Sequence, residues 1–256
     1  MQITAGIDVG SVATKVVMLV GEEIKYLIKP TGWSPRDAGV KAYDELLEQV
    51  GCSPKDVNCR VGTGYGRVSL SFIDKAVTEI HCHARGAAYL IGKGGLVVDI
   101  GGQDSKAILI NQKGKVLDFT MNDKCAAGTG RFLQVIATAL GVDVSELADL
   151  AVGRNPLEIN SMCTVFAESE VISLLAKGED KRDIIAGIHR SVARRVWSMA
   201  SRFGPVEQVI FTGGVAQNKD MQDKLTQASG CPVVVPEFSQ VAGALGAALY
   251  ARDIIS

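Results

Sequence analysis

Short apolar segments, each followed by a loop rich in glycine or aspartate, recur along much of the chain. A short apolar run bounded by turn residues is typical of a strand buried within a sheet. The segments that fit this pattern are 3–9, 15–20, 23–29, 57–63, 95–100, 106–111, 116–121, 206–211 and 232–235.

Longer segments place apolar residues three or four positions apart, which predicts helices. In residues 38–50, for example, Val40, Tyr43 and Leu47 fall on one side of a helix. The other segments with this spacing are 80–91, 131–140, 143–152, 165–177, 181–203, 216–228 and 241–251. Because strands and helices alternate, the pattern predicts the α/β class.

The order of the predicted elements near the start of the chain is repeated in its second part. Residues 1–30 and 95–122 share one plan of strand, Asp-x-Gly loop, strand, turn and strand. This internal repeat predicts two α/β lobes with a nucleotide cleft between them. We place the N-terminal lobe at 1–94, with a final helix at 239–256 packing back on it, and the C-terminal lobe at 95–238.

Two loops of the repeat have the composition of phosphate-binding turns. Asp8-Val9-Gly10-Ser11 and Asp99-Ile100-Gly101-Gly102 each follow an apolar strand, and a third glycine loop lies at 212–215. Glycine lets backbone N–H groups approach an anion, and an aspartate at the strand end can hold Mg²⁺ through water. The P-loop pattern GxxxxGK[ST] is absent from the sequence. Ordinary β-hairpins are the alternative interpretation.

Composition narrows the possible partners. The chain has 256 residues, 47% hydrophobic and 21% charged, with a formal net charge of −1. We therefore expect no nucleic-acid partner and no anionic membrane surface. No apolar run reaches the roughly 18 residues that a membrane helix needs. Six cysteines without a secretory pattern indicate a reducing, cytoplasmic compartment.

Two of the cysteines lie in unusual segments. Cys125 stands in MNDKCAAGTGRF (121–132) and Cys163 in NSMCTVFAESE (160–170), and we expect a helix to begin at each, with Thr164 as an N-cap. A helix N-terminus favours an anion such as a thiolate or an iron–sulfur cluster. Such clusters usually need four thiolates, which two chains related by a two-fold axis would supply. Buried free thiols are the alternative.

Three further groups have ordinary interpretations. His81-Cys82-His83 lies in a predicted helix, where adjacent residues point apart, so we expect no metal site there. The arginines at 190, 194 and 195 indicate a solvated helix face, with a docking patch for an acidic protein as the alternative. Trp33 and Trp197 indicate core or interface packing.

Motifs along the whole chain match those of one known family. The matching segments are GIDVGSVATK (6–15), TGYGR (63–67), DIGGQDSK (99–106), MNDKCAAGTGRF (121–132), CTVFAESEVIS (163–173), AGIHRSVARRV (186–196), TGGVAQN (212–218) and GALGAALYA (243–251). They resemble the BadF/BadG/BcrA/BcrD-type ATPase family, which includes the activators of 2-hydroxyacyl-CoA dehydratases. The resemblance implies the actin-like, ribonuclease-H-like duplicated two-lobe fold of the acetate and sugar kinases, heat-shock ATPases and actin.

The resemblance also implies cofactors and their ligands. It implies a homodimer that holds one [4Fe–4S] cluster through Cys125 and Cys163 of each chain, and ATP or ADP with Mg²⁺ near Asp8 and Asp99. Gln103 and Asp104 are candidates for positioning the attacking water. The residues implied at the nucleotide are Gly10, Ser11, Val12, Ala13, Thr14, Lys15, Gly101, Gly102, Gly213, Gly214 and Gln240. Val12 stands where we expect a threonine, so a hydroxyl contact would be lost there.

The activity implied is ATP-driven, one-electron activation of a 2-hydroxyacyl-CoA dehydratase, in an oxygen-sensitive protein reduced by ferredoxin or flavodoxin. Three alternatives remain open at this point. They are an ATPase subunit of a benzoyl-CoA-type reductase, a sugar or acyl kinase of the same fold, and an actin-like filament.

Overall fold

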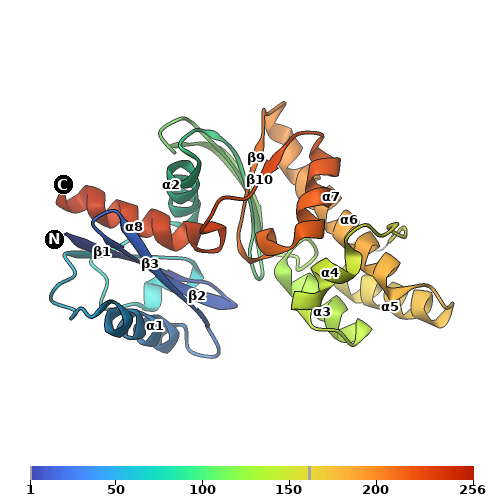
Figure 1. The fold of residues 1–256 in the computed structure, drawn as a ribbon, viewed down its shortest axis with the longest axis horizontal. Helices are drawn as coiled ribbons and strands as arrows, with labels where there is room; N and C mark the ends of the chain where they lie inside the picture. The colour runs from blue at the N-terminus through green and yellow to red at the C-terminus, as the bar shows by residue number, and fades with distance from the viewer. Residues whose placement is uncertain (1, 161–162) are drawn as a thin grey trace. The chain divides into compact units, whose positions relative to one another are not determined.

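The structure is a computed structural model that describes residues 2–160 and 163–256. Its internal contacts divide the chain into two compact units. Unit 1 comprises Met1–Gly94, Ile110–Asp118 and Pro236–Ser256, and unit 2 comprises Gly95–Leu109 and Phe119–Val235. Both units are α/β, as predicted, and are drawn in Figure 1.

Unit 1 is built on a mixed sheet with the strand order β3-β2-β1-β4-β5. The strands are β1 (Ile3–Val9), β2 (Ala13–Val20), β3 (Glu23–Pro30), β4 (Cys59–Thr63) and β5 (Lys75–Ala76). The first three form an antiparallel meander, and β4 runs parallel to β1. The two-residue strand β5 was not predicted, because it is too short to show a period of hydrophobic residues.

Helices cover both faces of this sheet (Figure 1). They are α1 (Pro35–Val50), η1 (Tyr65–Ser69), α2 (Glu79–Ile91), η5 (Ser239–Val241) and α8 (Ala242–Ile255). Tyr43 and Leu46 of α1 pack on one face, and Leu245 of α8 packs on the other. The helix α8 can approach β1 closely because Gly6 has no side chain, since a Cβ there would lie 2.0 Å from the Ala244 carbonyl oxygen. The C-terminal helix therefore belongs to unit 1.

The second sheet repeats the strand order of the first, as β10-β9-β6-β7-β8. Its strands are β6 (Gly95–Ile100), β7 (Ser105–Ile110), β8 (Val116–Asn122), β9 (Val209–Thr212) and β10 (Val233–Val234). In both sheets the central strand pairs with a parallel strand that comes after the meander. The predicted duplication of an α/β plan is thus confirmed by the topology.

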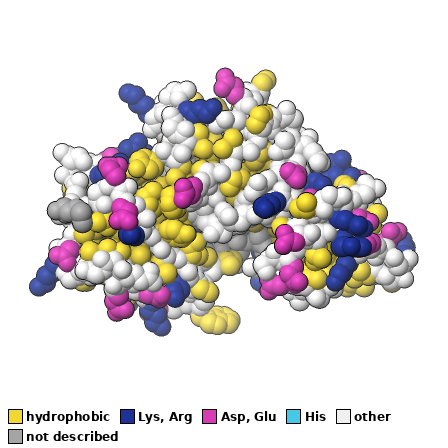
Figure 2. Space-filling model, in the orientation of Figure 1, with side chains coloured by type: hydrophobic (Ala, Val, Ile, Leu, Met, Phe, Trp, Pro, Cys, Tyr) yellow, Lys and Arg dark blue, Asp and Glu magenta, His cyan; other side chains and the backbone are white. Residues whose placement is uncertain are grey.

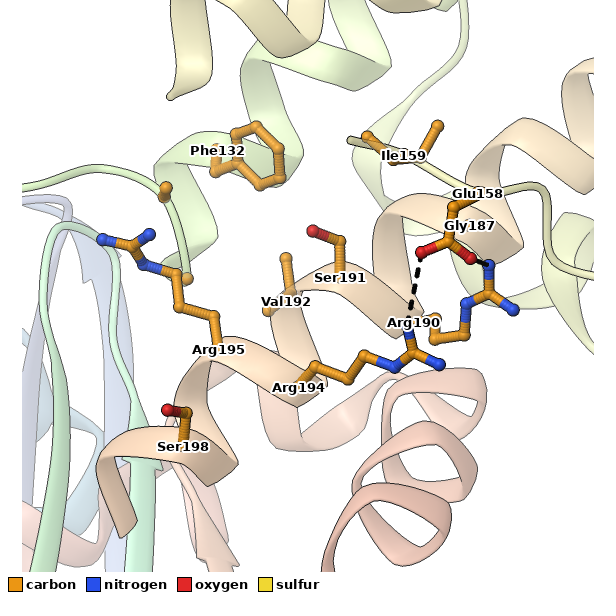
Figure 3. A pocket seen from close by; sticks show the side chains of 12 residues that line it. Phe132, Glu158, Ile159, Gly187, Arg190, Ser191, Val192, Arg194, Arg195 and Ser198 are labelled. Carbon is orange, nitrogen blue, oxygen red and sulfur yellow. Dashed lines mark hydrogen bonds and ion pairs between the residues drawn. The ribbon is translucent and has the colours of Figure 1, made fainter. Parts of the chain in front are cut away.

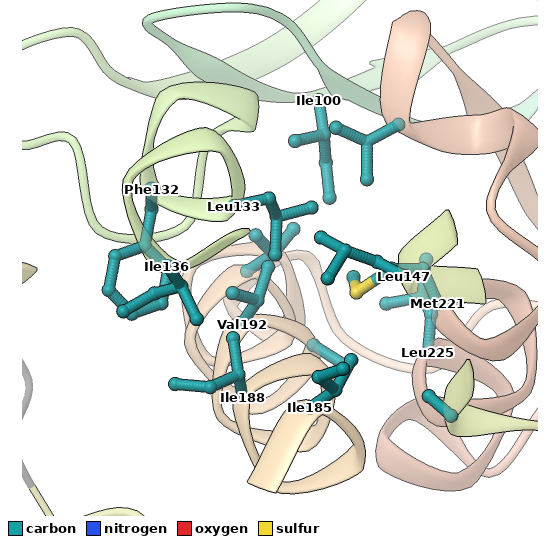
Figure 4. Close-up of a cluster of buried hydrophobic side chains, with 14 of the residues drawn as sticks. Ile100, Phe132, Leu133, Ile136, Leu147, Ile185, Ile188, Val192, Met221 and Leu225 are labelled. Carbon is teal, nitrogen blue, oxygen red and sulfur yellow. The ribbon is translucent and has the colours of Figure 1, made fainter. Parts of the chain in front are cut away.

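The helices of unit 2 enclose the larger core. They are α3 (Gly130–Leu140), η2 (Val144–Glu146), α4 (Leu147–Ala151), α5 (Thr164–Ala176), α6 (Lys181–Ala200), η3 (Ser201–Phe203), η4 (Gly214–Gln217) and α7 (Lys219–Ser229). Ile136, Leu147, Ile185 and Leu225 meet in this core from four different helices (Figure 4). None of the helices in the described residues is both long and apolar enough to cross a membrane.

Local capping explains where helix boundaries differ from the predicted ones. The predicted helix at 143–152 is two elements, because Asp143 and Glu146 form a capping box around a 3-10 turn. The helix predicted from residue 38 begins at Pro35, since Ser34 accepts a hydrogen bond from the Asp37 N–H. Trp33 is fully exposed just before this cap, so it does not pack in the core, and its packing at an interface stays a prediction.

Candidate functional site

The first predicted phosphate loop is the hairpin between β1 and β2. Asp8 is buried at the end of β1, and the Lys15 ammonium on β2 lies 3.3 Å from its Oδ2 atom. The Gly10 N–H donates to the Ala13 carbonyl at 3.1 Å, which closes the turn. Ala13 and Thr14, predicted to lie in the loop, belong to β2. The tip is therefore formed by the exposed Ser11 and the half-buried Val12.

The second predicted phosphate loop repeats this ion pair in unit 2. Lys106 is buried, and its Nζ atom lies 2.6 Å from Asp104 Oδ2 and 3.7 Å from Asp99 Oδ2. The Thr212 hydroxyl donates to Asp99 Oδ1 at 2.8 Å. Sequence reasoning missed Lys106 and Thr212. The sequence did contain a signal for Lys106, because it follows Asp99 by the same seven positions that separate Lys15 from Asp8.

A glycine beside each aspartate adopts the same unusual conformation. Gly64 has φ 80° and ψ 179°, and Gly213 has φ 91° and ψ 175°. Side-chain-bearing residues rarely adopt this conformation. A Cβ on Gly64 would lie 2.4 Å from Asp8 Oδ1, and one on Gly213 would lie 2.3 Å from the Ile100 carbonyl oxygen. In each unit, the backbone at this glycine thus lies close to the end of the central strand.

The loop after β6 is tied to the start of α3. The Gly130 and Arg131 N–H groups donate to the carbonyls of Gly101 and Gly102 at 2.9 and 2.7 Å. Gln103 is exposed at the tip of this loop. A loop that presents backbone and a side-chain amide to solvent can bind a phosphate group.

The remaining residues predicted at the nucleotide are divided between the units. Gly214 begins η4 in unit 2, with nothing within 4 Å of a Cβ built on it. Gln240 lies in η5 of unit 1 and is partly buried. The roles predicted for both residues remain predictions.

Each unit has a buried aspartate whose chemistry would suit Mg²⁺. Within the described residues, no group of three or more His, Cys, Asp or Glu side chains could hold a metal ion. Mg²⁺ usually keeps several waters and binds through one or two carboxylates together with substrate phosphates. Asp8 and Asp99 each provide one buried carboxylate of this kind, at the end of the central strand of its own unit.

The two predicted cluster cysteines are both free thiols with access to solvent. Cys163 is exposed and is itself the N-cap of α5, so the prediction of Thr164 as the cap is wrong. Cys125 is half-buried in a turn that precedes α3, whose N-cap is Thr129, so no helix begins at Cys125. Asn122 holds that turn, since its side-chain amide donates to the carbonyls of Cys125 and Ala127.

Large apolar side chains stand exposed near Cys163. Val165 and Phe166 are 67% and 68% exposed in the first turn of α5, and Ile172 is 54% exposed. Isolated surface hydrophobics are common, but several on one short helix indicate a surface that another molecule covers. The exposed thiol therefore lies beside a candidate interface.

Charge elsewhere on the surface is mixed. Figure 2 shows acidic and basic side chains interspersed over the face that it draws. The arginine face of α6 is only partly solvated, which corrects the prediction. Arg190 and Arg194 both bind Glu158, at 2.6 and 3.3 Å, and only Arg194 is exposed.

Comparison with known proteins agrees with these features. The family model described as the BadF/BadG/BcrA/BcrD ATPase family matches residues 5–251. The chain is 50% identical to the (R)-2-hydroxyglutaryl-CoA dehydratase activating ATPase of Acidaminococcus fermentans, over 97% of this chain and 96% of the relative. A solved structure of the activator of the 2-hydroxyisocaproyl-CoA dehydratase from Clostridium difficile, with bound ADPNP, superposes with a TM-score of 0.94. It is 43% identical and the match covers 99% of this chain and 95% of that one.

A more distant structure shows the fold alone. A ROK family glucokinase from Streptomyces griseus is 14% identical and superposes with a TM-score of 0.61, over 98% of this chain and 99% of that one. Together with the duplicated sheets, this likeness confirms the predicted actin-like two-lobe fold. The chain belongs to the BadF/BadG/BcrA/BcrD ATPase family.

Proposed function

We propose that the protein is an ATP-dependent one-electron donor that activates a 2-hydroxyacyl-CoA dehydratase. Relatives at 44% and 50% identity over nearly the whole chain are named as activators of such dehydratases. Two accessible thiols on the same unit as a predicted phosphate loop support the transfer of this activity to the chain. The electron comes from reduced ferredoxin or flavodoxin and passes to the dehydratase.

In this proposal the hairpins of β1–β2 and β6–β7 bind the phosphates of ATP. Asp8 and Asp99 would hold Mg²⁺ through water, and the ammonium groups of Lys15 and Lys106 would balance part of the negative charge of the phosphates. Gln103, at the tip of the second loop, orients the attacking water. Positioning and electrostatic stabilisation of this kind are the main contributions that a protein makes to phosphoryl transfer.

Cys125 and Cys163 of two identical chains would together provide four thiolates for one [4Fe–4S] cluster. When bound, the cluster supplies one-electron transfer at low potential. The solvent-accessible thiols fit this arrangement, because neither is enclosed by its own chain. The exposed Val165 and Phe166 beside Cys163 would then be covered by the second chain.

The observation that carries the proposal is the pair of hydrogen bonds that join the predicted phosphate loop to the start of α3, just after the turn of Cys125. Gly101 and Gly102 accept hydrogen bonds from the first residues of α3, and Cys125 lies five positions before that helix. A loop that shifts when ATP is hydrolysed would therefore move the start of α3 and the turn before it. This path lies within unit 2 and needs no other part of the chain.

The test is activation of a purified 2-hydroxyacyl-CoA dehydratase under anaerobic conditions, with dithionite as the reductant. We expect activation that requires both this protein and ATP, and that ADP does not support. Cys163→Ser should abolish activation but leave nucleotide binding intact. Conversion of ATP to ADP with transfer of the phosphoryl group to a sugar or carboxylate acceptor would instead identify a kinase and would contradict the proposal.

A further inference from the structure

A cavity of about 200 Å³ lies in unit 2 beside the turn that carries Cys125. Figure 3 shows α6 along one side of it, with Phe132 and Ile159 opposite Ser191. Ala127 and Gly128 of the cysteine turn also line it. The lining thus combines apolar side chains with polar groups from α6.

The charged part of the lining is net positive. Three arginines, at 190, 194 and 195, face one glutamate, Glu158, among the described lining residues. Arg190 and Arg194 both bind Glu158, and Arg190 also donates to the Leu157 carbonyl at 3.0 Å. These contacts hold two of the guanidinium groups in place and neutralise only part of their charge.

Arg195 differs from the other two arginines. In the part of the chain that the structure describes, its guanidinium has no ion pair or hydrogen bond, and neither does the hydroxyl of Ser191 or Ser198. All three side chains lie at the cavity, and Arg195 is half-buried. Three side-chain donors that contact no acceptor in the described residues thus face one cavity, where an acceptor from outside the chain could bind them.

The size of the cavity limits what that acceptor can be. An engineered apolar cavity of about 150 Å³ is large enough to bind benzene. Arginine recognises carboxylate and phosphate groups through parallel hydrogen bonds, and a serine hydroxyl can add another. We propose that the cavity binds a small organic oxyanion, a phosphate or carboxylate carried by a short or single-ring apolar body. The oxyanion contacts Arg195 and Ser191, and the apolar body packs against Phe132 and Ile159.

Binding at this cavity would act on the cysteine turn. The Arg195 stem lies along Gly128, where a Cβ would be 3.3 Å from Arg195 Cδ. Gly128 has φ 88° and follows Cys125 by three residues. An anion that fixes Arg195 therefore also restrains this turn. The binding site does not depend on the proposed function, whereas this effect matters to electron transfer only if that function holds.

The experiment is calorimetric titration of the protein saturated with ADP, which occupies the predicted phosphate loops. The probes are phenyl phosphate, inorganic phosphate and phenol. We expect saturable binding of phenyl phosphate, and at least tenfold weaker binding of either fragment alone. No binding of phenyl phosphate up to about 10 mM would overturn the proposal.

Variants then locate the binding. Arg195→Gln should weaken phenyl phosphate binding at least tenfold, and Ser191→Leu, which fills the cavity, should do the same. Lys181→Gln is the matched control, because it removes one positive charge from an exposed position on the same helix. Equal affinity in the wild type and both cavity variants would place the ligand elsewhere. An equal loss in the control would indicate general electrostatic attraction, which also contradicts the site.

Discussion

Replacing Gly213 by alanine should lower the free energy of unfolding of unit 2 far more than the same change at its neighbour Gly214. Gly213 has φ 91° and ψ 175°, and a Cβ there would lie 2.3 Å from the Ile100 carbonyl oxygen. The backbone conformation alone costs about 1–3 kcal/mol for alanine. The contact with the carbonyl forces β6 or η4 to move as well. We therefore expect unit 2 to lose about 3 kcal/mol or more of its free energy of unfolding.

Gly214 is the matched control for this substitution. A Cβ there meets nothing within 4 Å. Alanine also lowers the entropy of the unfolded chain, so the change should stay within about 1 kcal/mol in either direction.

Thermal unfolding followed by circular dichroism measures the difference between the two variants. For a domain of this size, 3 kcal/mol corresponds to a fall in Tm of about 9 °C. ATP hydrolysis should fall in the same variant, because Ile100 directly follows Asp99. If Gly213→Ala and Gly214→Ala unfold at the same temperature, the close approach of this loop to β6 is wrong.

Two further substitutions and one labelling experiment test other parts of the structure. Lys106→Met removes the ammonium group that lies 3.7 Å from the buried carboxylate of Asp99, and should lower the free energy of unfolding in urea by about 3 kcal/mol. An unchanged urea midpoint would contradict the buried ion pair. Burial would raise the pKa of Asp220, but the hydrogen bond from His189 and the nearby Lys224 outweigh it and hold that pKa below its usual value. The stabilisation of the fold by ionised Asp220 is thus present above about pH 4 and is lost as the pH falls through the lowered pKa. Asp220→Asn should therefore make Tm depend less on pH below about pH 4. An unchanged dependence would contradict the pairing of Asp220 with His189. Burial raises the pKa of the Cys82 thiol to about 12, whereas Cys163 is exposed. In iron-free protein, iodoacetamide should therefore modify Cys163 well before Cys82, as peptide mass spectrometry would show. The reverse order would contradict the burial of Cys82.

The strands could be predicted because a buried strand consists of a short run of apolar residues, which can be read from the sequence. The segment 3–9 became β1 with the same bounds, and 95–100 became β6. Helix ends were less accurate, since a cap depends on one side chain reaching one N–H group, as Ser34 does. The strand β5 has two residues and carries no periodic signal.

The positions of the two loops in the candidate site were predicted, while their binding of phosphate stays a prediction. The loops at Asp8 and Asp99 were found because glycine and aspartate at a strand end have a local signature. The buried Lys106 was missed, although its distance in sequence from Asp99 repeats that of Lys15 from Asp8. The cavity beside Cys125 could not have been found, because Glu158 and Arg195 lie far apart in the sequence and only the tertiary structure brings both to one lining.

The most direct test of the central claim is the iron and acid-labile sulfide content of the protein purified without oxygen, together with its mass in solution. The account predicts a dimer with about four iron and four sulfide per two chains, a visible absorption that dithionite bleaches, and loss of the iron in Cys125→Ser and Cys163→Ser. A colourless protein that still hydrolyses ATP would contradict the account and would leave both cysteines as ordinary thiols.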